Sequence, residues 1–500
     1  MNRFRKILSP PPWVVAVIGF LILLPSISRQ SLGLEESQTW NYARLDSPSE
    51  SWAALQSDQN IEAQMPLAMI AASGWSEVFG TDEWAMRSIN LLWLAVALAA
   101  LTLVAREASM PWLPLLFAIQ PFVWYSMDSA RPQLMQMAGG ALLLAGTLKL
   151  LNGSNRWLKI ALLLSAGSLI LCGTNIFGVV PLIVLLTLLL GTAAWRNLLV
   201  ARESKIFLFL TGGLLMLIGV YYLSTLIRGA GEVKLWSVTP LNLLAVVYEF
   251  LGFTGLGPSR QELREILRGA VPATELWSHL PGWICLAGAY ALVGIAAAKT
   301  WLTRVECGPR KPPFRLWAFC ALVPVLSGFL LFCLATAYGI PFWGQHLAGT
   351  LPFSVTTLAV LIHWSTQGLW RRAGRLASLL VIGLLLLSSG LIRGLPRHKH
   401  DDYRGAARAV LALSTRESVI WWVAGEAGGK YYGLTFVKEG PGIVHSPNRT
   451  VAPASLPEAL VISRPENFDS LGIAGDLIRS GSYQEVAKLQ AFEVWKRVDK

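Results

Sequence analysis

Long apolar runs follow one another through the first 396 residues of the chain. Most approach the roughly 20 residues with which a helix crosses about 30 Å of hydrocarbon. The composition agrees, because 54% hydrophobic residues against 14% charged residues is too apolar for a soluble globular protein. The sequence therefore predicts a polytopic α-helical membrane protein with about eleven transmembrane helices, at residues 13–28, 85–105, 111–126, 133–150, 158–172, 176–194, 206–226, 281–299, 316–337, 347–364 and 376–392.

The loops between these runs differ in charge. Basic residues precede the first run and gather in every second loop, at residues 3–6, 149–159, 196–205, 299–315 and 371–375. Cytoplasmic loops carry the excess of Lys and Arg, so this pattern places the N-terminus in the cytoplasm. An odd number of spans then places the C-terminus outside, together with the acidic first loop. The net charge of +12 is therefore a topology signal, and no nucleic-acid partner is expected.

The chain divides into two predicted domains. Residues 1–396 form the transmembrane domain, whose first run is expected to be a retained anchor, because further spans follow and no small-residue cleavage site follows Pro25. Its first outer loop, residues 29–84, favours helices at 49–56 and 66–79, and a second outer segment favours an interfacial helix at 260–268. Residues 397–500 alternate strand-like runs (419–424, 459–463, 492–498) with helical stretches (403–413, 470–479), which predicts a small extracytoplasmic α/β domain.

A series of motifs begins in the first outer loop. The adjacent carboxylates Leu34-Glu35-Glu36 follow the first span. Gln64-Met65-Pro66-Leu67 comes next, then Gly80-Thr81-Asp82-Glu83 leading to Arg87, and then a Tyr125-Ser126 segment running to Arg131-Pro132. This order resembles the membrane glycosyltransferases of the C-type superfold, the group containing protein mannosyltransferases and lipid A aminoarabinose transferases. In this sequence Glu35 replaces the usual Asp of that pattern, and Gln64 stands where His is common.

The resemblance implies an enzyme of the bacterial inner membrane that transfers a sugar from a polyprenyl-phosphate donor to a lipid, glycan or protein acceptor on the outer side. Membrane lipid is the remaining implied partner. No nucleotide cofactor is required, and a divalent metal ion is left open. The implied reaction is an inverting displacement, in which Glu35 acts as the base and Glu36 orients the acceptor or holds a cation. Which of the two is the working base stays open, and two solvated loop acids are the simpler interpretation.

Further candidates for substrate binding lie at outer helix ends. Arg131 would lie near the departing phosphate with Asp128 setting its rotamer, whereas the simpler interpretation is an i,i+3 ion pair at a helix end. Arg87, Arg228 and His346 are the other candidates, and ordinary interfacial or structural residues are the alternative for each.

Other functions would require other features of the sequence. A transporter or flippase of a lipid-linked glycan is the alternative function, and inverted repeats or broken helices would favour it. A polymerase or ligase predicts a large outer loop late in the chain, whereas the large loop here is early. Residues 425–430 lack the spacing of a phosphate loop and predict a turn. His398, His400, Asp401 and Asp402 predict a linker between the domains rather than a metal site.

Overall fold

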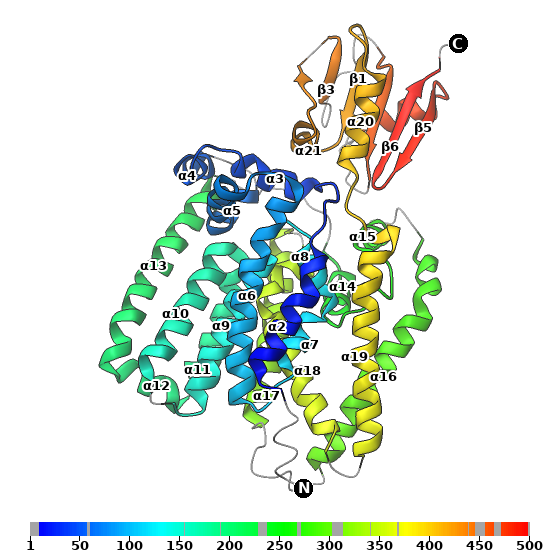
Figure 1. Ribbon diagram of the computed structural model, residues 1–500. Helices are drawn as coiled ribbons and strands as arrows, with labels where there is room; N and C mark the ends of the chain where they lie inside the picture. Colours follow the sequence, from blue (N-terminus) through cyan, green and yellow to red (C-terminus); the bar gives the residue numbers. More distant parts are fainter. Residues whose placement is uncertain are drawn as a thin grey trace.

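A computed structural model describes residues 10–498 apart from short segments, namely 58–60, 155, 191, 229–237, 268–271, 303–313, 341, 368–369, 439, 446–455 and 465–471. The basic residues 3–6 and most of the basic loop before the ninth predicted span lie outside the described residues. The chain forms a helical domain with a smaller α/β domain above one end (Figure 1).

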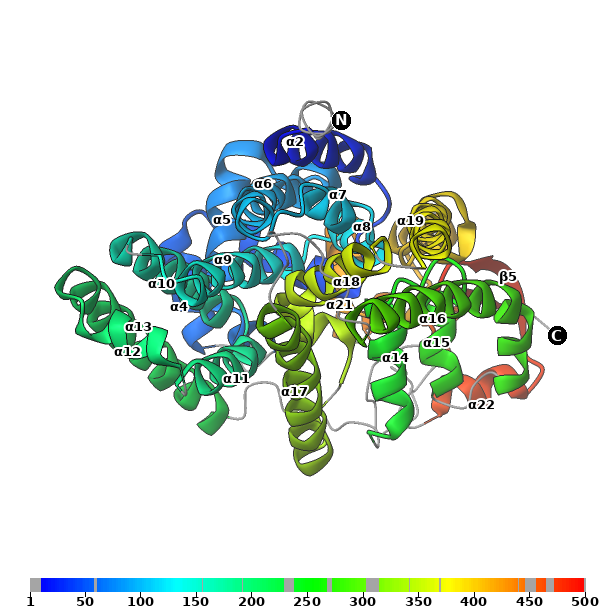
Figure 2. The ribbon, with the colours of Figure 1, turned by 90° about the horizontal axis from the view of Figure 1, so that it is seen from below.

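Within the described ranges, 8 helices are long and apolar enough to cross a membrane. They are α6 (Glu83–Glu107), α9 (Gln133–Leu151), α10 (Trp157–Thr174), α13 (Arg202–Ile227), α16 (Leu280–Leu302), α17 (Phe314–Tyr338), η5 with α18 (Gly344–Ser365) and α19 (Arg371–Gly394). Viewed from below, α17 and α18 lie between a group containing α10 and α13 and a group containing α16 and α19 (Figure 2).

The expected number of about eleven spans is not confirmed. Two of the predicted spans are shorter apolar helices, α2 with η1 (Pro12–Ser26) and η3 with α11 (Ile176–Leu190). A third, residues 111–126, is divided into α7 (Leu113–Ala118) and α8 (Pro121–Met127). The break has a local cause, because Pro121 has no backbone N–H to continue the ladder and disfavours helical geometry at the residue before it. Gln120 is accordingly extended, at φ −72° and ψ 126°.

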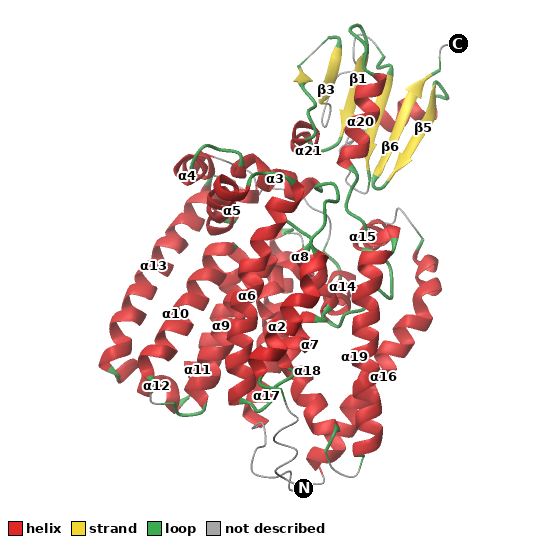
Figure 3. Cartoon of the chain, in the orientation of Figure 1, coloured by secondary structure: helices red, strands yellow, loops and turns green. Residues whose placement is uncertain are grey.

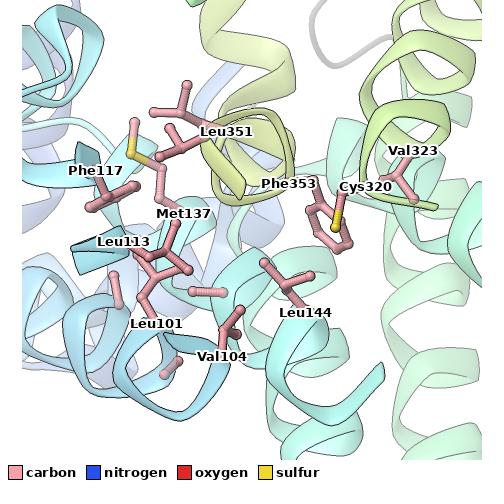
Figure 4. Close-up of a cluster of buried hydrophobic side chains, with 14 of the residues drawn as sticks. Leu101, Val104, Leu113, Phe117, Met137, Leu144, Cys320, Val323, Leu351 and Phe353 are labelled. Carbon is pink, nitrogen blue, oxygen red and sulfur yellow. The ribbon is translucent and has the colours of Figure 1, made fainter. Parts of the chain in front are cut away.

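The helices of the transmembrane domain close around a buried apolar core. Figure 4 shows Leu101 of α6, Phe117 of α7 and Met137 of α9 with side chains of α17 and α18. Two backbones approach closely in this region, because a Cβ atom on Gly140 of α9 would lie 1.8 Å from the carbonyl oxygen of Gly349 in η5. The backbone of α9 is thereby packed directly against η5, which precedes α18.

Three short helices of the first outer loop lie at the end of the transmembrane domain that faces the α/β domain (Figure 1). They are α3 (Leu34–Ala43), α4 (Pro48–Ser57) and α5 (Pro66–Phe79). The helices expected at 49–56 and 66–79 are thus present, but Glu35 and Glu36 lie in a helix rather than in the expected irregular loop. The second outer segment contains α14 (Pro240–Phe250) and α15 (Arg260–Leu267), the latter at the expected position.

The C-terminal domain has a six-stranded sheet of order β2-β3-β1-β4-β6-β5 (Figure 3). Strands β1, β2, β3 and β4 pair in parallel, whereas β6 pairs antiparallel with β4 and β5. Alternate side chains of β1 enter opposite faces, so Trp422 packs against α20 and Trp421 against α22. The strands are β1 (Val419–Val423), β2 (Phe436–Val437), β3 (Gly442–His445), β4 (Ala459–Ser463), β5 (Tyr483–Leu489) and β6 (Phe492–Arg497), and the helices are α20 (Tyr403–Leu413), α21 (Glu426–Tyr431) and α22 (Ile473–Arg479).

This arrangement confirms the small α/β domain expected at the end of the chain. The three strands and two helices that the sequence predicts are β1, β4, β6, α20 and α22, and β2, β3 and β5 are additional. The turn expected at residues 425–430 is wrong, because most of this segment forms the short helix α21.

Candidate active site

Glu35 and Glu36 occupy the first turn of α3. The Glu36 carboxylate accepts a hydrogen bond of 2.9 Å from the backbone N–H of Gly33 and so caps the helix that contains it. Carboxylates are favourable here because the N-terminus of a helix carries partial positive charge. Neighbouring residues of a helix point about 100° apart. The two carboxylates therefore enter different surroundings.

Glu36 is buried and holds Arg87 of α6 in a two-pronged ion pair. Arg87 Nε and Nη2 donate to Glu36 Oε1 and Oε2, each at 2.8 Å. The backbone N–H of Ala130 also donates to Glu36 Oε1, at 2.7 Å. Burial raises the pKa of Glu36, but the charges of Arg87 and His400 and the hydrogen bonds lower it further, so that it lies below its ordinary value. Glu36 is therefore an ionised structural anchor with its oxygens occupied.

Arg87 is fully buried, and each of its N–H groups has a partner. The remaining N–H groups of Nη1 and Nη2 donate to the backbone carbonyls of Ser28, Gln30 and Ser31, at 3.1, 3.0 and 3.1 Å. A guanidinium has five N–H donors, and here all five are used within the protein. This geometry favours a positioning role, in which Arg87 holds the start of the first outer loop on α6.

Asp128 lies at the end of α8 and extends the same network. Its carboxylate accepts hydrogen bonds from Ser28 N at 2.7 Å and Ser28 Oγ at 2.9 Å, and it forms an ion pair with Arg393 of α19. Burial raises the pKa of Asp128, but His400, Arg87 and Arg393 lower it to well below its usual range. The carboxylate thus joins the first outer loop to the last helix of the transmembrane domain.

His400 lies between the two buried carboxylates. Its Nδ1 is 3.6 Å from Glu36 Oε2 and its Nε2 is 3.5 Å from Asp128 Oδ2. The sequence analysis predicts only a linker role for this residue. Its location shows that the segment entering the C-terminal domain is built into the charged network beside α3.

Both carboxylates line one cavity, but only Glu35 is exposed in it. Its side chain is 40% exposed, and its Oε2 lies 3.6 Å from Arg131 Nε, while Oε1 lies 3.9 Å from Arg264 Nη2. Burial raises the pKa of Glu35, but the guanidinium groups of Arg131, Arg264 and Arg260 lower it more, so the pKa lies below its ordinary value of 4.5. Glu35 is therefore an ionised carboxylate that a molecule in the cavity can reach.

The cavity measures about 160 Å³ and lies where α3, α8 and α15 meet the segment after α19. Arg260 packs over the ring of Tyr125 at 4.0 Å, and its Nε donates to Glu249 at 2.6 Å. Its Nη2 is buried with no hydrogen-bond acceptor among the described residues. The cationic side chains that line the cavity are Arg260, Arg264, Arg397 and Lys399.

Arg131 does not form the i,i+3 ion pair with Asp128 that is the simpler interpretation of these two residues. The segment between α8 and α9 is not helical, so the i,i+3 geometry is absent and the two side chains join different networks. Arg131 Nη1 donates to Glu62 Oε1 at 3.2 Å and to the backbone carbonyl of Glu35 at 3.0 Å. Burial raises the pKa of Glu62 despite the nearby Arg131. Arg131 thus holds the backbone of Glu35, whereas Asp128 belongs to the network of Ser28 and Arg393.

Two candidates are not among the residues that line this cavity, although His346 is close enough to Glu35 and Arg260 to interact with their charges. Arg228 is exposed at the end of α13 and is not among the residues that line it. His346 is buried in η5, where its Nδ1 accepts a hydrogen bond from Trp343 N at 3.3 Å and its ring packs 4.5 Å from Phe177. These contacts favour a structural role for His346. Among the described residues, no group of three or more His, Cys, Asp and Glu could hold a metal ion.

Sequence reasoning missed most of the cationic lining. Arg260 and Arg264 were interpreted only as part of an interfacial helix, and Arg397 and Lys399 lie in the segment interpreted as a linker. One signal was present, since both basic stretches belong to segments that the sequence predicts to be outside, where the positive-inside rule expects few Lys and Arg.

No family model matches the sequence, and no curated protein sequence matches it. Among solved structures, the chain is similar to ArnT from Cupriavidus metallidurans in the apo state, with 14% identity, 97% of each chain covered and a TM-score of 0.44. It is also similar to ArnT from the same organism bound to undecaprenyl phosphate, with 16% identity, 98% of each chain covered and a TM-score of 0.43. Both likenesses extend over almost the whole chain, but with identities and TM-scores this low they assign no residue a role.

Proposed function

We propose that this protein is a membrane glycosyltransferase that transfers a sugar from a polyprenyl-phosphate donor to a lipid, glycan or protein acceptor. The observation that carries the proposal is the location of Glu35, an accessible carboxylate in a cavity lined by cationic side chains. The cavity lies at the end of a domain built from candidate membrane spans. A lipid-borne phosphate can reach such a place without leaving the membrane.

The cationic lining suits a phosphate that leaves with negative charge. Arg260 has a buried donor, Nη2, with no acceptor among the described residues, and Arg264 lies on the same side of α15 one helical turn later. Guanidinium groups bind phosphate with strong, directional hydrogen bonds. We assign donor binding mainly to Arg260 and Arg264, and a supporting role to Arg397 and Lys399, which also line the cavity.

Glu35 is the proposed general base. The acceptor O–H or N–H attacks the anomeric carbon, its proton passes to the Glu35 carboxylate, and the bond from carbon to phosphate oxygen breaks with its electron pair leaving on the phosphate. Attack opposite the leaving group inverts the anomeric configuration. The low pKa of Glu35 keeps the carboxylate ionised before the reaction. A bound phosphate would offset the charges of Arg264 and Arg260 and so raise this pKa, which makes Glu35 a stronger base once the donor is present.

The remaining residues hold this base in place. Glu36 and Arg87 fix the first turn of α3, and Arg131 contacts both the backbone and the carboxylate of Glu35. Asp128 ties the same region to α19 through Arg393. We therefore assign these side chains positioning roles, and Glu35 the reaction itself. Arg228 and His346 remain candidates for substrate binding outside the lining of the cavity.

The proposal includes a location. The protein would lie in a bacterial inner membrane with its N-terminus in the cytoplasm and its C-terminal domain outside. The first outer loop and the C-terminal domain lie at the same end of the chain's helical domain, as this topology requires (Figure 1). Labelling of single cysteines from outside intact cells tests it, and labelling of the C-terminal domain only after cell lysis would contradict it.

The function is tested first in cells and then with purified protein. Surface glycans and glycolipids are compared in cells with and without the gene, and one missing sugar would identify the donor. Wild type, Glu35→Gln and Glu77→Gln are then supplied with the matching labelled lipid-linked sugar. Glu77 is an exposed acid of α5 in the same loop and serves as the control. Loss of a general base predicts a decrease in transfer of about 10²- to 10⁴-fold for Glu35→Gln alone.

Two outcomes would overturn the proposal. Transfer by Glu35→Gln close to that of wild type, at equal expression, would remove Glu35 as the base. Movement of the lipid-linked sugar across vesicle membranes without any transferred product would instead show the alternative, a transporter or flippase.

A further inference from the structure

A second cleft lies on the other side of α3, between the first outer loop and the C-terminal domain. It measures about 670 Å³ and is bounded by α3, the start of α6, α20 and α21. Trp40 of α3 lines it, five residues after Glu35. At 100° and 1.5 Å per residue, the two side chains point about 140° apart and lie roughly 7 Å apart along the helix axis. The two sites are therefore neighbours separated by one helix.

Aromatic rings form one wall of this cleft. Tyr431 meets Trp40 edge-on at 5.2 Å and Tyr432 at 4.7 Å, and all three side chains are partly exposed. The tyrosines are held in place, because Tyr431 donates to the Thr81 carbonyl at 3.2 Å and Tyr432 accepts from Leu32 N at 2.7 Å. Rigid aromatic faces that are partly open to water suit the C–H face of a sugar ring, which is apolar while its edges carry hydroxyls.

The charges of the cleft favour an anion. Its acids are occupied, since Asp82 caps α6 and Glu83 binds Arg404 and Tyr432. Arg408 lies four residues after Arg404 and shares its face of α20. Arg408 and Arg29 are exposed at the cleft, and neither side chain has an ion pair or hydrogen bond among the described residues.

We infer that this cleft binds an anionic saccharide, a sugar that carries a phosphate or carboxylate group. The sugar ring stacks on Trp40 and Tyr431, and its anionic group binds Arg408 and Arg29. The cleft volume of about 670 Å³ accommodates a mono- or disaccharide, since ligand sites commonly measure about 300–1,000 Å³. That this saccharide is part of the acceptor rests on the proposed function, whereas its binding does not.

The test is a binding measurement with the purified full-length chain in detergent. Saturation-transfer NMR titrations use glucuronic acid and glucose 1-phosphate as probes, with glucose and inorganic phosphate as the matched ligands that lack the charge or the ring. Both anionic sugars should bind at least about tenfold more tightly than either matched ligand, since one charge-assisted hydrogen bond accounts for about that factor.

Variants locate the site. Arg408→Ala and Arg29→Ala should each weaken binding about tenfold, and both residues are exposed, so the fold should be kept. Arg416→Ala, at an exposed arginine of the same domain outside the cleft, should bind like wild type. Glu35→Gln should also bind like wild type, because its carboxylate lies in the other cavity.

Several results would overturn the inference. Absence of binding by both anionic sugars, equally tight binding of glucose or phosphate, or unchanged binding in both Arg408→Ala and Arg29→Ala would each do so. Loss of binding in Glu35→Gln would place the saccharide in the cavity beside Glu35. Binding that persists in a protein without transferase activity would support the cleft and contradict the proposed function alone.

Discussion

Replacing Glu36 with Gln removes the charge from the buried partner of Arg87 while keeping the size of the side chain. In the native protein, each oxygen of Glu36 accepts two hydrogen bonds: Oε1 from Arg87 Nε and Ala130 N, and Oε2 from Arg87 Nη2 and Gly33 N. An amide presents one oxygen and one NH₂ group. In either orientation of the amide, its NH₂ group takes the place of one carboxylate oxygen. One N–H of Arg87 and one backbone N–H then point at this NH₂ group, which cannot accept their hydrogen bonds.

The cost follows from this count. One lost bond involves the Arg87 guanidinium, worth about 1.5–3 kcal/mol, and the other strands a buried backbone N–H, at about 1–3 kcal/mol. Arg87 also keeps its charge in a buried site, and breaking one side of a buried ion pair typically costs about 3–5 kcal/mol. We therefore expect Glu36→Gln to lower the free energy of unfolding by about 3–5 kcal/mol. Glu35→Gln, whose side chain is 40% exposed, should change it by at most about 1 kcal/mol.

The assay compares thermal unfolding of the two variants in detergent, followed by size-exclusion chromatography after heating, with transfer activity measured on the surviving protein. The expected result is a clear separation. Glu36→Gln lowers the melting temperature and keeps measurable transfer below it, whereas Glu35→Gln keeps the melting temperature and loses transfer. Equal melting temperatures for Glu36→Gln and wild type would refute the structural role of Glu36, and normal transfer by Glu35→Gln would refute its role as base.

Three further predictions concern pH, packing and the domain junction. In the free protein the pKa of Glu35 lies below 4.5, so its base form is present above that pKa and is lost as pH falls through it. The acid limb of the kcat/KM profile, which reports the free enzyme, should therefore lie below pH 4.5 and shift upward in Arg264→Gln. Gly140→Ala forces a Cβ to within 1.8 Å of a backbone oxygen and should destabilise by about 1–3 kcal/mol or more in thermal unfolding, whereas Gly288→Ala, with nothing within 4 Å, should not. His400→Ala removes contacts with two buried carboxylates and should increase proteolysis of the segment joining the domains.

Each of these predictions has a contrary result. An acid limb at the same pH in Arg264→Gln and wild type would show that this limb does not report the titration of Glu35. Equal melting temperatures for the two glycine variants would mean that the backbone contact of Gly140 relaxes freely. Unchanged proteolysis of His400→Ala would show that other contacts alone hold the two domains together.

Local patterns in the sequence were sufficient for the membrane class and for many of the elements. Apolar length predicts the long spans, and helical or alternating periodicity predicts α5, α20 and strands β1, β4 and β6, because each of these signals is carried by consecutive residues. The count of spans was less certain for the same reason. Whether residues 111–126 form one helix or two depends on Pro121 and on what α7 and α8 pack against, and hydropathy averages over both.

The candidate site depended on contacts between distant residues. The sequence could place Glu35 and Glu36 side by side after the first span, but it could not say which one would face a cavity. That division arises because Arg87, 51 residues after Glu36, and Ala130, 94 residues after it, converge on one carboxylate and leave the other open. His400, which follows the transmembrane domain in the sequence, reaches the same network. Hydropathy and the order of charges thus determine which segments enter the membrane and which remain outside it. The pairing of buried charges is determined by packing, because a buried charge is stable only beside a partner, and that partner can come from any part of the sequence.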